Sequence, residues 1–454
     1  MKGVRSSTTA TPSVLASLSA DGWLLVVARG VRTFAYGFLS VVLGLYLAAL
    51  GHGEAEIGVV FAAAMAGGAA TTLLVTAVAD RLGRRRMLRF GALLMALAGS
   101  VFALTDNLAL LVLAALVGAM SPSGGETGPF LAVEQAALPQ TTRDEHRTAV
   151  FAWYNLVGSL ATAVGALVAA LPAVVGLDGL DGYRLLVWCY VLAGLALVLV
   201  FARLSPAVEV EPTVGLGRRP RVGLHRSRRI VAGLAALYAV DAFAGGFIVQ
   251  GLLAYWFHWR FGVDETRLGA LFFGTNLLSA LSYLVAARVA RRFGLLKTMV
   301  FTHLPSNLIL LLVPLMPTFP LAALLLLARH ALSQMDVPTR QSYTVAVVDP
   351  DERSAAAGIT TVARNVASAI APAFAGATLT SPIGLPFLIA GSLKAAYDLT
   401  LYAAFRHVKP PEEVDAPSRI ERGGASLDRG ATGHAGGRPA VDRAAAPSGE
   451  ERLA

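Results

Sequence analysis

Several ionisable side chains lie inside long apolar stretches of this sequence, where a charge is costly. The residues concerned are Arg29, Arg32, Glu126, Glu134, Asp241, Arg329, Asp336 and Arg340. A charge at the centre of a membrane-buried helix costs about 2.5 to 3.5 kcal/mol, so each group needs a partner, a wet cavity or a function. In a cavity, an arginine can bind an anionic solute. A carboxyl there can carry a proton, because desolvation favours its protonated form.

Two interpretations of these charges remain open. Arg32 and Asp241 stand far from both ends of their stretches, so neither reaches the membrane surface by snorkelling. With Glu126 and Asp336 they form the predicted cavity set, which binds solute or protons. The other four charges, of Arg29, Glu134, Arg329 and Arg340, lie nearer to helix ends or can pair locally. The alternative is a set of internal salt bridges that only fix helix packing.

Other polar residues in the apolar stretches favour simple packing roles. Lys394 and Asp398 stand four residues apart and can pair on one helix face. Arg364 has a carboxylate partner that the sequence does not identify. His303 and His330 are interpreted as polar core residues and not as proton relays.

The sequence shows no pattern typical of an enzyme or of an ATP-driven motor. The glycine-rich piece SPSGGETGPF, residues 121 to 130, lacks the G-K-[ST] ending of a phosphate-binding loop. No metal-ligand spacing and no nucleophile with its base is visible. We therefore expect no enzymatic activity, no cofactor and no metal. The same piece and SQMDVPTRQSY, residues 333 to 343, each place a proline next to an acid, which predicts broken helices beside a cavity.

The elements that carry these residues are predicted to be membrane-spanning helices. Hydrophobic residues make up 55% of the 454 residues and charged residues only 15%, against about 25% charged in soluble proteins. Twelve apolar segments are each long enough to cross a bilayer. They cover 22 to 50, 56 to 79, 87 to 105, 107 to 136, 147 to 171, 184 to 202, 230 to 256, 267 to 287, 296 to 315, 320 to 348, 354 to 377 and 386 to 406. The predicted fold is all-α.

Basic residues are divided unequally between the two sets of loops. Loops 80 to 89, 139 to 148, 203 to 229, 288 to 297 and 349 to 354 hold 19 Lys and Arg, whereas the opposite loops hold three. This is the positive-inside pattern, so the net charge of +9 records topology and not a nucleic-acid partner. We expect a multi-pass protein of the plasma (inner) membrane with both termini cytoplasmic, working as a monomer. The single cysteine, Cys189, cannot form an intrachain disulfide.

The two halves of the chain repeat one another. Adding 211 takes Gly58 to Gly269 and Gly83 to Gly294, and adding 206 takes HRTA at 146 to 149 onto ERSA at 352 to 355. Similar offsets take Arg32 to Asp241 and Glu126 to Asp336. A duplicated six-helix unit explains this pattern.

The repeat predicts five regions. They are a flexible cytoplasmic N-terminus at 1 to 21, a six-helix bundle at 22 to 203, a cytoplasmic linker at 204 to 229, a second six-helix bundle at 230 to 406, and a disordered cytoplasmic tail at 407 to 454. The tail is rich in Gly, Ala, Pro and mixed charge, a composition that cannot build a core.

A charged motif connects the second and third segments. It reads D-R-x-G-R-R and comprises Asp80, Arg81, Gly83, Arg84 and Arg85, with a decayed copy, RRFG, at 291 to 294. With the repeat and the twelve helices, this motif resembles the major facilitator superfamily. Thr76 replaces the leading glycine of the family pattern.

The resemblance implies that helices 1, 4, 7 and 10 line a central cavity and that the motif is a latch on the cytoplasmic side. A plain topology anchor is the alternative role for the motif. The resemblance also implies a secondary active transporter of a small organic solute working by alternating access. We expect proton coupling and favour efflux; signatures of the drug antiporters and sugar porters are missing, so no subfamily is assigned. An uncoupled facilitator and a non-transporting membrane sensor or scaffold are the alternatives.

Overall fold

The protein is described from a computed structural model that covers residues 18–125, 128, 130–142, 147–177, 179–209, 224–349 and 352–408. These residues form helices and connecting turns without a strand. The α-helices are α1 (Ala20–Ala49), α2 (Glu54–Leu82), α3 (Arg84–Leu104), α4 (Leu108–Val117), α5 (Phe130–Ala137), α6 (Arg147–Leu167), α7 (Leu171–Val174), α8 (Gly179–Ala202), α9 (Arg228–Gly246), α10 (Gln250–Phe261), α11 (Glu265–Phe293), α12 (Leu295–Leu312), α13 (Phe319–Ser333), α14 (Asp336–Ala346), α15 (Arg353–Thr378) and α16 (Leu385–Phe405). Short 3-10 turns are η2 (Leu138–Thr141), η4 (Val168–Ala170), η5 (Pro206–Val208) and η6 (Val313–Leu315).

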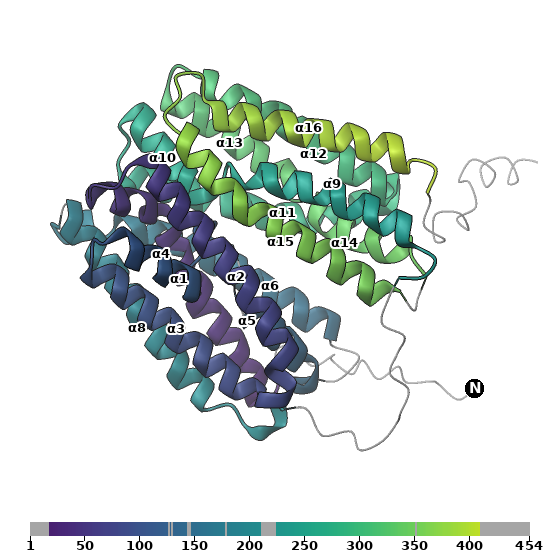
Figure 1. Cartoon of the computed structure of the whole chain (residues 1–454), viewed down its shortest axis with the longest axis horizontal. Helices are drawn as coiled ribbons and strands as arrows, with labels where there is room; N and C mark the ends of the chain where they lie inside the picture. Colours follow the sequence, from purple (N-terminus) through teal and green to yellow (C-terminus); the bar gives the residue numbers. More distant parts are fainter. Residues whose placement is uncertain are drawn as a thin grey trace, which may run out of the picture. The chain divides into compact units, whose positions relative to one another are not determined.

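These helices make twelve membrane spans in two six-helix bundles, which confirms the predicted fold class. In chain order, the spans are α1, α2, α3, α4 with α5, α6, α8, α9 with α10, α11, α12, α13 with α14, α15 and α16. Eight helical stretches of the described chain are long and apolar enough to cross a bilayer. The other four are spans 4 and 10, which are each divided into two shorter helices, and spans 11 and 12, which carry more polar residues. Figure 1 shows the first bundle in purple to blue and the second in teal to yellow.

Three spans are interrupted. The breaks in spans 4 and 10 are the predicted ones, between α4 and α5 and between α13 and α14. In span 10 the ring of Pro338 removes the bond to the carbonyl of Gln334, and Gln334 is where α13 ends. The break in span 7, at 247 to 249, was not predicted, because it follows two glycines and no proline.

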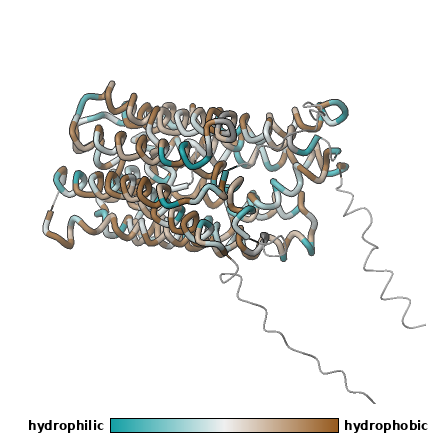
Figure 2. The backbone as a smooth tube through the Cα atoms, turned by 90° about the horizontal axis from the view of Figure 1, so that it is seen from below, coloured by the Kyte–Doolittle hydropathy of each residue, from teal (hydrophilic) through white to brown (hydrophobic). Residues whose placement is uncertain are grey.

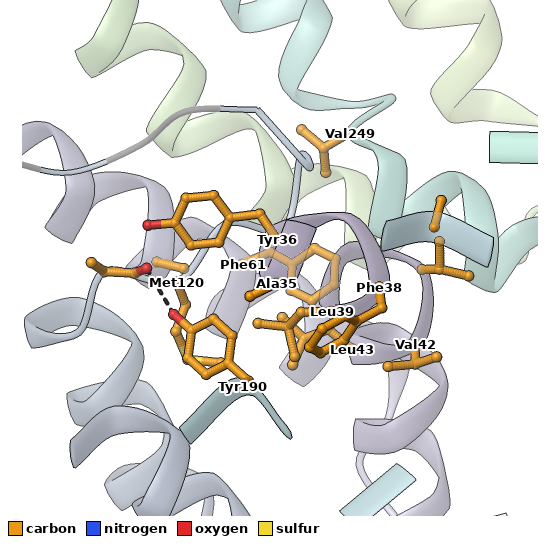
Figure 3. Packing of buried hydrophobic residues seen from close by; sticks show 14 of the residues in the cluster. Ala35, Tyr36, Phe38, Leu39, Val42, Leu43, Phe61, Met120, Tyr190 and Val249 are labelled. Atoms are coloured by element: carbon orange, nitrogen blue, oxygen red, sulfur yellow. Dashed lines mark hydrogen bonds between the residues drawn. The ribbon is translucent and has the colours of Figure 1, made fainter. Parts of the chain in front are cut away.

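The outer surface of the bundles is apolar, as lipid contact requires. Leu74, Leu104, Leu199 and Leu324 are each more than 60% exposed. Figure 2 shows hydrophobic residues along the helices and hydrophilic ones gathered at helix ends and at a few internal positions. Inside, aromatic and aliphatic side chains pack around α1, and the Tyr190 hydroxyl donates to the Ala119 carbonyl at 2.8 Å (Figure 3).

The halves are equivalent in backbone detail. Gly83 and Gly294 join spans 2 to 3 and 8 to 9 with φ of 95° and 89°, a conformation that favours glycine. A Cβ on Gly58 of α2 would lie 2.5 Å from the Pro372 carbonyl oxygen of α15. A Cβ on Gly269 of α11 would lie 2.6 Å from the Ala166 carbonyl oxygen of α6. The repeat relates these two contacts, so the bundles meet by the same glycine contact twice.

Both contacts lie at one end of the bundles, which we call the short-loop end. The opposite end, which we call the basic end, carries the described residues 83, 203–209, 224–227, 294, 347–349 and 352. At the short-loop end the Tyr255 hydroxyl donates to Glu54 at 3.3 Å, and the Tyr183 hydroxyl donates to Glu265. Deeper in, Gly251 N–H donates to the Pro122 carbonyl at 2.9 Å. The interrupted spans 4 and 7 thus use their freed backbone groups to join the two bundles.

Carboxylates cap helix starts at the basic end. Glu209 accepts backbone N–H bonds from Arg84 at 2.6 Å and Arg85 at 3.2 Å, at the start of α3. Glu352 accepts from Ser227 at 2.9 Å and from two preceding residues, at the start of α9. Hydrogen bonds from the Ser227 side chain and from these backbone groups lower the pKa of Glu352 to about 2. Each half therefore anchors a helix start with one ionised carboxylate.

We predict that Glu352→Gln lowers the thermal unfolding midpoint by a few degrees, equally at about pH 5 and about pH 8. The folded pKa lies below its ordinary value of 4.5, so the stabilisation is present above that value and lost as pH falls toward 2. Thermal unfolding of the purified protein measures this. Asp349→Asn is the control, because Asp349 is 41% exposed in its pair with Arg226 and should contribute little. An effect of Glu352→Gln that disappears at the higher pH would contradict the expectation.

We predict that Gly58→Val disfavours the state that is closed at the short-loop end. Its side chain would meet backbone and not a movable side chain. Overpacking of about 1 to 3 kcal/mol changes a conformer ratio by about five- to 150-fold. The readout is labelling of a Gln135→Cys reporter in a Cys189→Ser background, because Gln135 faces the space between the bundles toward the basic end. Labelling should fall.

The matched control for this variant is Gly358→Val in α15, because a Cβ at Gly358 meets nothing within 4 Å. Equal labelling in the two valine variants would show that the Gly58 contact does not hold the bundles together.

Candidate functional site

A cavity of about 480 Å³ lies between the bundles in the middle of the chain's membrane-spanning part. The first bundle contributes α1, α6 and the break of span 4; the second contributes α9, α10, α11, α13 and α16. Helices of spans 1, 4, 7 and 10 therefore line it, as the sequence predicts, together with spans 5, 8 and 12. Its size suits a drug-sized organic molecule.

This cavity continues toward the basic end. A second cavity of about 500 Å³ shares Arg29, Ser159 and Tyr283 with the first and is bounded by α5, α6, α11 and α14. A third, of about 280 Å³, shares Leu131 and Gln135 with the second and lies against α2 and α15. The space between the bundles thus extends toward the basic end, and contacts close it at the short-loop end.

Arg32 lies behind the wall of the first bundle. Its guanidinium donates to both Glu134 oxygens at 2.7 Å, and both side chains are 0% exposed. The Tyr154 hydroxyl also donates to Glu134, and the Phe130 ring lies 4.5 Å from the guanidinium carbon. This bidentate pair joins spans 1 and 4, the geometry with the best directionality for an arginine and a carboxylate.

Arg29 stands one helical turn before Arg32 on α1 and lines the cavity. Its guanidinium carbon lies 4.3 Å from the centre of the Tyr154 ring, and Nη2 donates to Asn155 at 3.5 Å. Of the two arginines of span 1, the structure therefore places Arg29 on the cavity wall and Arg32 behind it.

Asp241 is the centre of a charged cluster in the second bundle, and it is 3% exposed. Lys394 Nζ lies 2.5 Å from its Oδ1 and Arg364 Nη1 lies 2.9 Å from its Oδ2. Arg340 Nη1 lies 3.3 Å from Oδ2 and 2.6 Å from Asp336. Spans 7, 10, 11 and 12 are thus held together around one carboxylate.

A histidine connects this cluster to a second buried carboxylate. His303 Nδ1 lies 2.9 Å from Asp398, and Nε2 lies 3.9 Å from Asp241. Asn307 Nδ2 donates to the other Asp398 oxygen at 2.9 Å. The expected pair between Lys394 and Asp398 is not formed, because each meets a partner from another helix.

Three cationic side chains line the cavity: Arg29, Arg329 and Lys394. His330 is a further lining residue, and the described lining contains no aspartate or glutamate. Arg329 is 6% exposed, and within the described chain it makes no ion pair and its Nε has no hydrogen-bond partner. A charged group this buried is costly without a partner.

The structure brings together Arg32 with Glu134, and Asp241 with Asp336 and Arg340, in two separate clusters. Glu126 lies outside the described residues, as do the side chains of Asp80 and Arg81. Arg84 Nη1 donates to the Ala136 carbonyl at 3.1 Å, within the first bundle.

The sequence analysis assigned Lys394 and His303 to packing roles, and for Arg329 it left a cavity role and a packing role open. Lys394 had a plausible partner four residues away, and only the rotation of α16 shows that it faces Asp241 instead. The sequence does contain one indication that Arg329 belongs to the site. This arginine lies in an apolar run and has no acidic residue three or four positions away to pair with.

Comparison with known proteins agrees with this geometry. The family model of the Major Facilitator Superfamily matches residues 25–326 and 235–442. An uncharacterized membrane protein of Saccharomyces cerevisiae, YJR124C, is 29% identical over 422 residues, which covers 85% of this chain and 94% of the yeast protein.

Solved structures share the fold. The nucleoside transporter NupG superposes with a TM-score of 0.68 at 14% identity, covering 86% of this chain and 100% of NupG. A bacterial homologue of the human lysosomal transporter Spinster gives 0.68 at 12% identity, covering 88% and 99% of the two chains. A D-xylose–proton symporter gives 0.64 at 15% identity, covering 86% and 98%. With its family match, its two six-helix bundles and its central cavity, the chain belongs to the Major Facilitator Superfamily of transporters.

Proposed function

We propose that this protein is a secondary active transporter that moves a small organic solute by alternating access and exchanges it for protons. The observation that carries the proposal is the central cavity, closed at one end by contacts between the bundles and continuous with further space toward the other. A protein of this fold that served only as a scaffold would have no need of a cavity between its halves.

The contacts at the closed end are of a kind that can open. Gln250 Nε2 donates to Ser40 of the other bundle at 2.9 Å, and its amide oxygen accepts from Asn276 at 3.2 Å. Each such hydrogen bond contributes only about 1 kcal/mol net, since water replaces the partner when the bundles part. The glycine contacts allow close approach without interlocking side chains. Rocking about the cavity therefore breaks a few weak hydrogen bonds and separates apolar side chains that pack across the closed end.

Proton coupling is supported by the position of Lys394. It binds Asp241 and also lines the cavity, so the charge on the Asp241 cluster affects the cavity wall. His303 lies between Asp241 and Asp398, and an imidazole is the side chain best suited to gain a proton between about pH 5 and 8. A positive charge on His303 competes for Asp241, weakens its hold on Lys394 and makes this ammonium available to solute.

We further propose the direction of transport and the membrane, and the loop charges support the orientation on which the direction depends. The excess of Lys and Arg in one set of loops supports a cytoplasmic basic end, and the cavity then faces the cytoplasm. A solute would enter from the cytoplasm in this state and leave in the opposite one, in exchange for an incoming proton. This is export across the plasma membrane, with both termini cytoplasmic.

The test is flux in proteoliposomes under an imposed pH gradient. Vesicles hold a mixture of carboxylates, amines, sugars and nucleosides, and the contents are assayed before and after the gradient is applied. The parent protein should move at least one solute against its gradient. His303→Gln should retain downhill flux of that solute and lose the response to the pH gradient, because the bridge between Asp241 and Asp398 no longer binds a proton.

Asp241→Asn and Asp336→Asn should also abolish uphill flux, and Asp349→Asn, an exposed carboxylate, should not. His303→Gln leaves every ion pair of Arg340, Arg364 and Lys394 in place, so it remains informative where an aspartate variant fails to fold. Uphill flux that survives in all three cluster variants would refute the proton site.

A second prediction concerns the charged motif. If it latches the basic end shut in the opposite state, replacing Arg81 and Arg85 by Ala should favour the state open at that end. Labelling of the Gln135→Cys reporter in the Cys189→Ser background should then rise. Arg291→Gln, a charge change in the decayed motif copy, is the control. Unchanged labelling in the double variant would leave the motif as a topology anchor only.

A further inference from the structure

The charges inside the membrane-spanning helices of the second bundle do not balance. Four cationic side chains, of Arg329, Arg340, Arg364 and Lys394, face three carboxylates, of Asp241, Asp336 and Asp398. In the first bundle Arg32 pairs with Glu134, and Arg29 contacts Tyr154 and Asn155. Within its described helices the second bundle therefore has one positive charge in excess.

The excess is located at the cavity. Arg32, Arg340 and Arg364 point their charges at carboxylates, whereas Arg329 lines the cavity with no ion pair in the described chain. Its Nε is buried and has no hydrogen-bond partner. Asp241 and Asp336 act on Arg329 only through space, and cations already neutralise both. A guanidinium in this position is satisfied by an anionic group that enters the cavity.

The cations lie on opposite walls. Arg29 comes from α1 in the first bundle, and Arg329 and Lys394 come from α13 and α16 in the second. If Lys394 leaves Asp241 to bind a ligand, Asp241 still has two cationic partners, Arg364 at 2.9 Å and Arg340 at 3.3 Å. One anionic group can thus be bound from both bundles at once.

The rest of the lining is mixed. Ile248, Val249, Leu253 and Phe272 are apolar, and Gln250 and Asn276 offer amide groups at the closed end. Such a wall accommodates a hydrophobic body with a few polar substituents. Building on the proposed transport function, we infer that the cavity takes an amphiphilic organic anion whose carboxylate or sulfonate group is bound by Arg329, Lys394 and Arg29.

The test is binding to the full-length protein in detergent without a gradient, which separates it from the transport assay. The probes share one aromatic body: naphthalene-2-carboxylate and naphthalene-2-sulfonate as anions, naphthalene-2-methanol as the neutral form and naphthalene-2-methylammonium as the cation. Thermal stabilisation and calorimetry measure binding. Both anions should bind at least about tenfold more tightly than the other two, with affinity that falls as salt is raised.

Arg329→Gln should weaken anion binding about tenfold or more, since a charge-assisted hydrogen bond is lost, and Arg329→Lys should restore part of it. Arg291→Gln removes one positive charge from the exposed basic end of α11 and should leave binding unchanged. Because Arg329 has no ion pair to lose in the described chain, its replacement should not lower the unfolding midpoint, which checks that the variant is folded.

Tighter binding of the cation or the neutral probe, or anion binding that is equal in Arg329→Gln and the parent, would overturn the inference. Anion binding without gradient-driven flux of any solute would refute proton-coupled transport and leave the anion site standing. Gradient-driven flux of neutral or cationic solutes without anion binding would refute the anion site and leave proton-coupled transport standing.

Discussion

The second bundle depends on a single carboxylate. Asp241 receives Lys394, Arg364 and Arg340 from three other spans, in a region where none of these charges is tolerated alone. The first bundle uses a simpler device, the bidentate pair of Arg32 and Glu134. The repeat makes Arg32 and Asp241 equivalent, so the same position on spans 1 and 7 carries the central charge of each bundle with opposite sign.

Each bundle is thereby a firm body with its own internal ion pairs, and the interface between them is of a different nature. In the described residues it includes glycine contacts, two tyrosine–glutamate bonds, the Gln250 and Gly251 bonds, and apolar side chains of both bundles that pack in one cluster. The strong electrostatic interactions are inside the parts that move as units, and the weak ones are between those parts. This division of strengths suits rigid-body motion.

Sequence was sufficient for the fold because lipid imposes simple rules: apolar length gives the spans, and basic loops give the predicted orientation. Proline also located two of the three breaks. The sequence did not predict the third break, at 247 to 249. There two glycines permit a break, and tertiary contacts determine that it forms. For the site, sequence identified which charges are buried but not their pairing. The pairing depends on how each helix is rotated about its axis. Arg29 and Arg32 lie one turn apart on α1, yet Arg29 lines the cavity and Arg32 is buried in its pair with Glu134.

The bond from Gly251 N–H to the Pro122 carbonyl is made by main-chain atoms of two interrupted spans. Replacing Pro122 leaves the acceptor in place. A Cβ at 251 would lie 2.6 Å from the Phe61 ring and 3.2 Å from the Pro122 carbonyl oxygen, so the donor position requires glycine. This contact between the bundles can therefore be retained while the side chains that line the cavity change. Evolution or protein engineering can therefore change the substrate selectivity of the cavity without changing the main-chain contact that closes it.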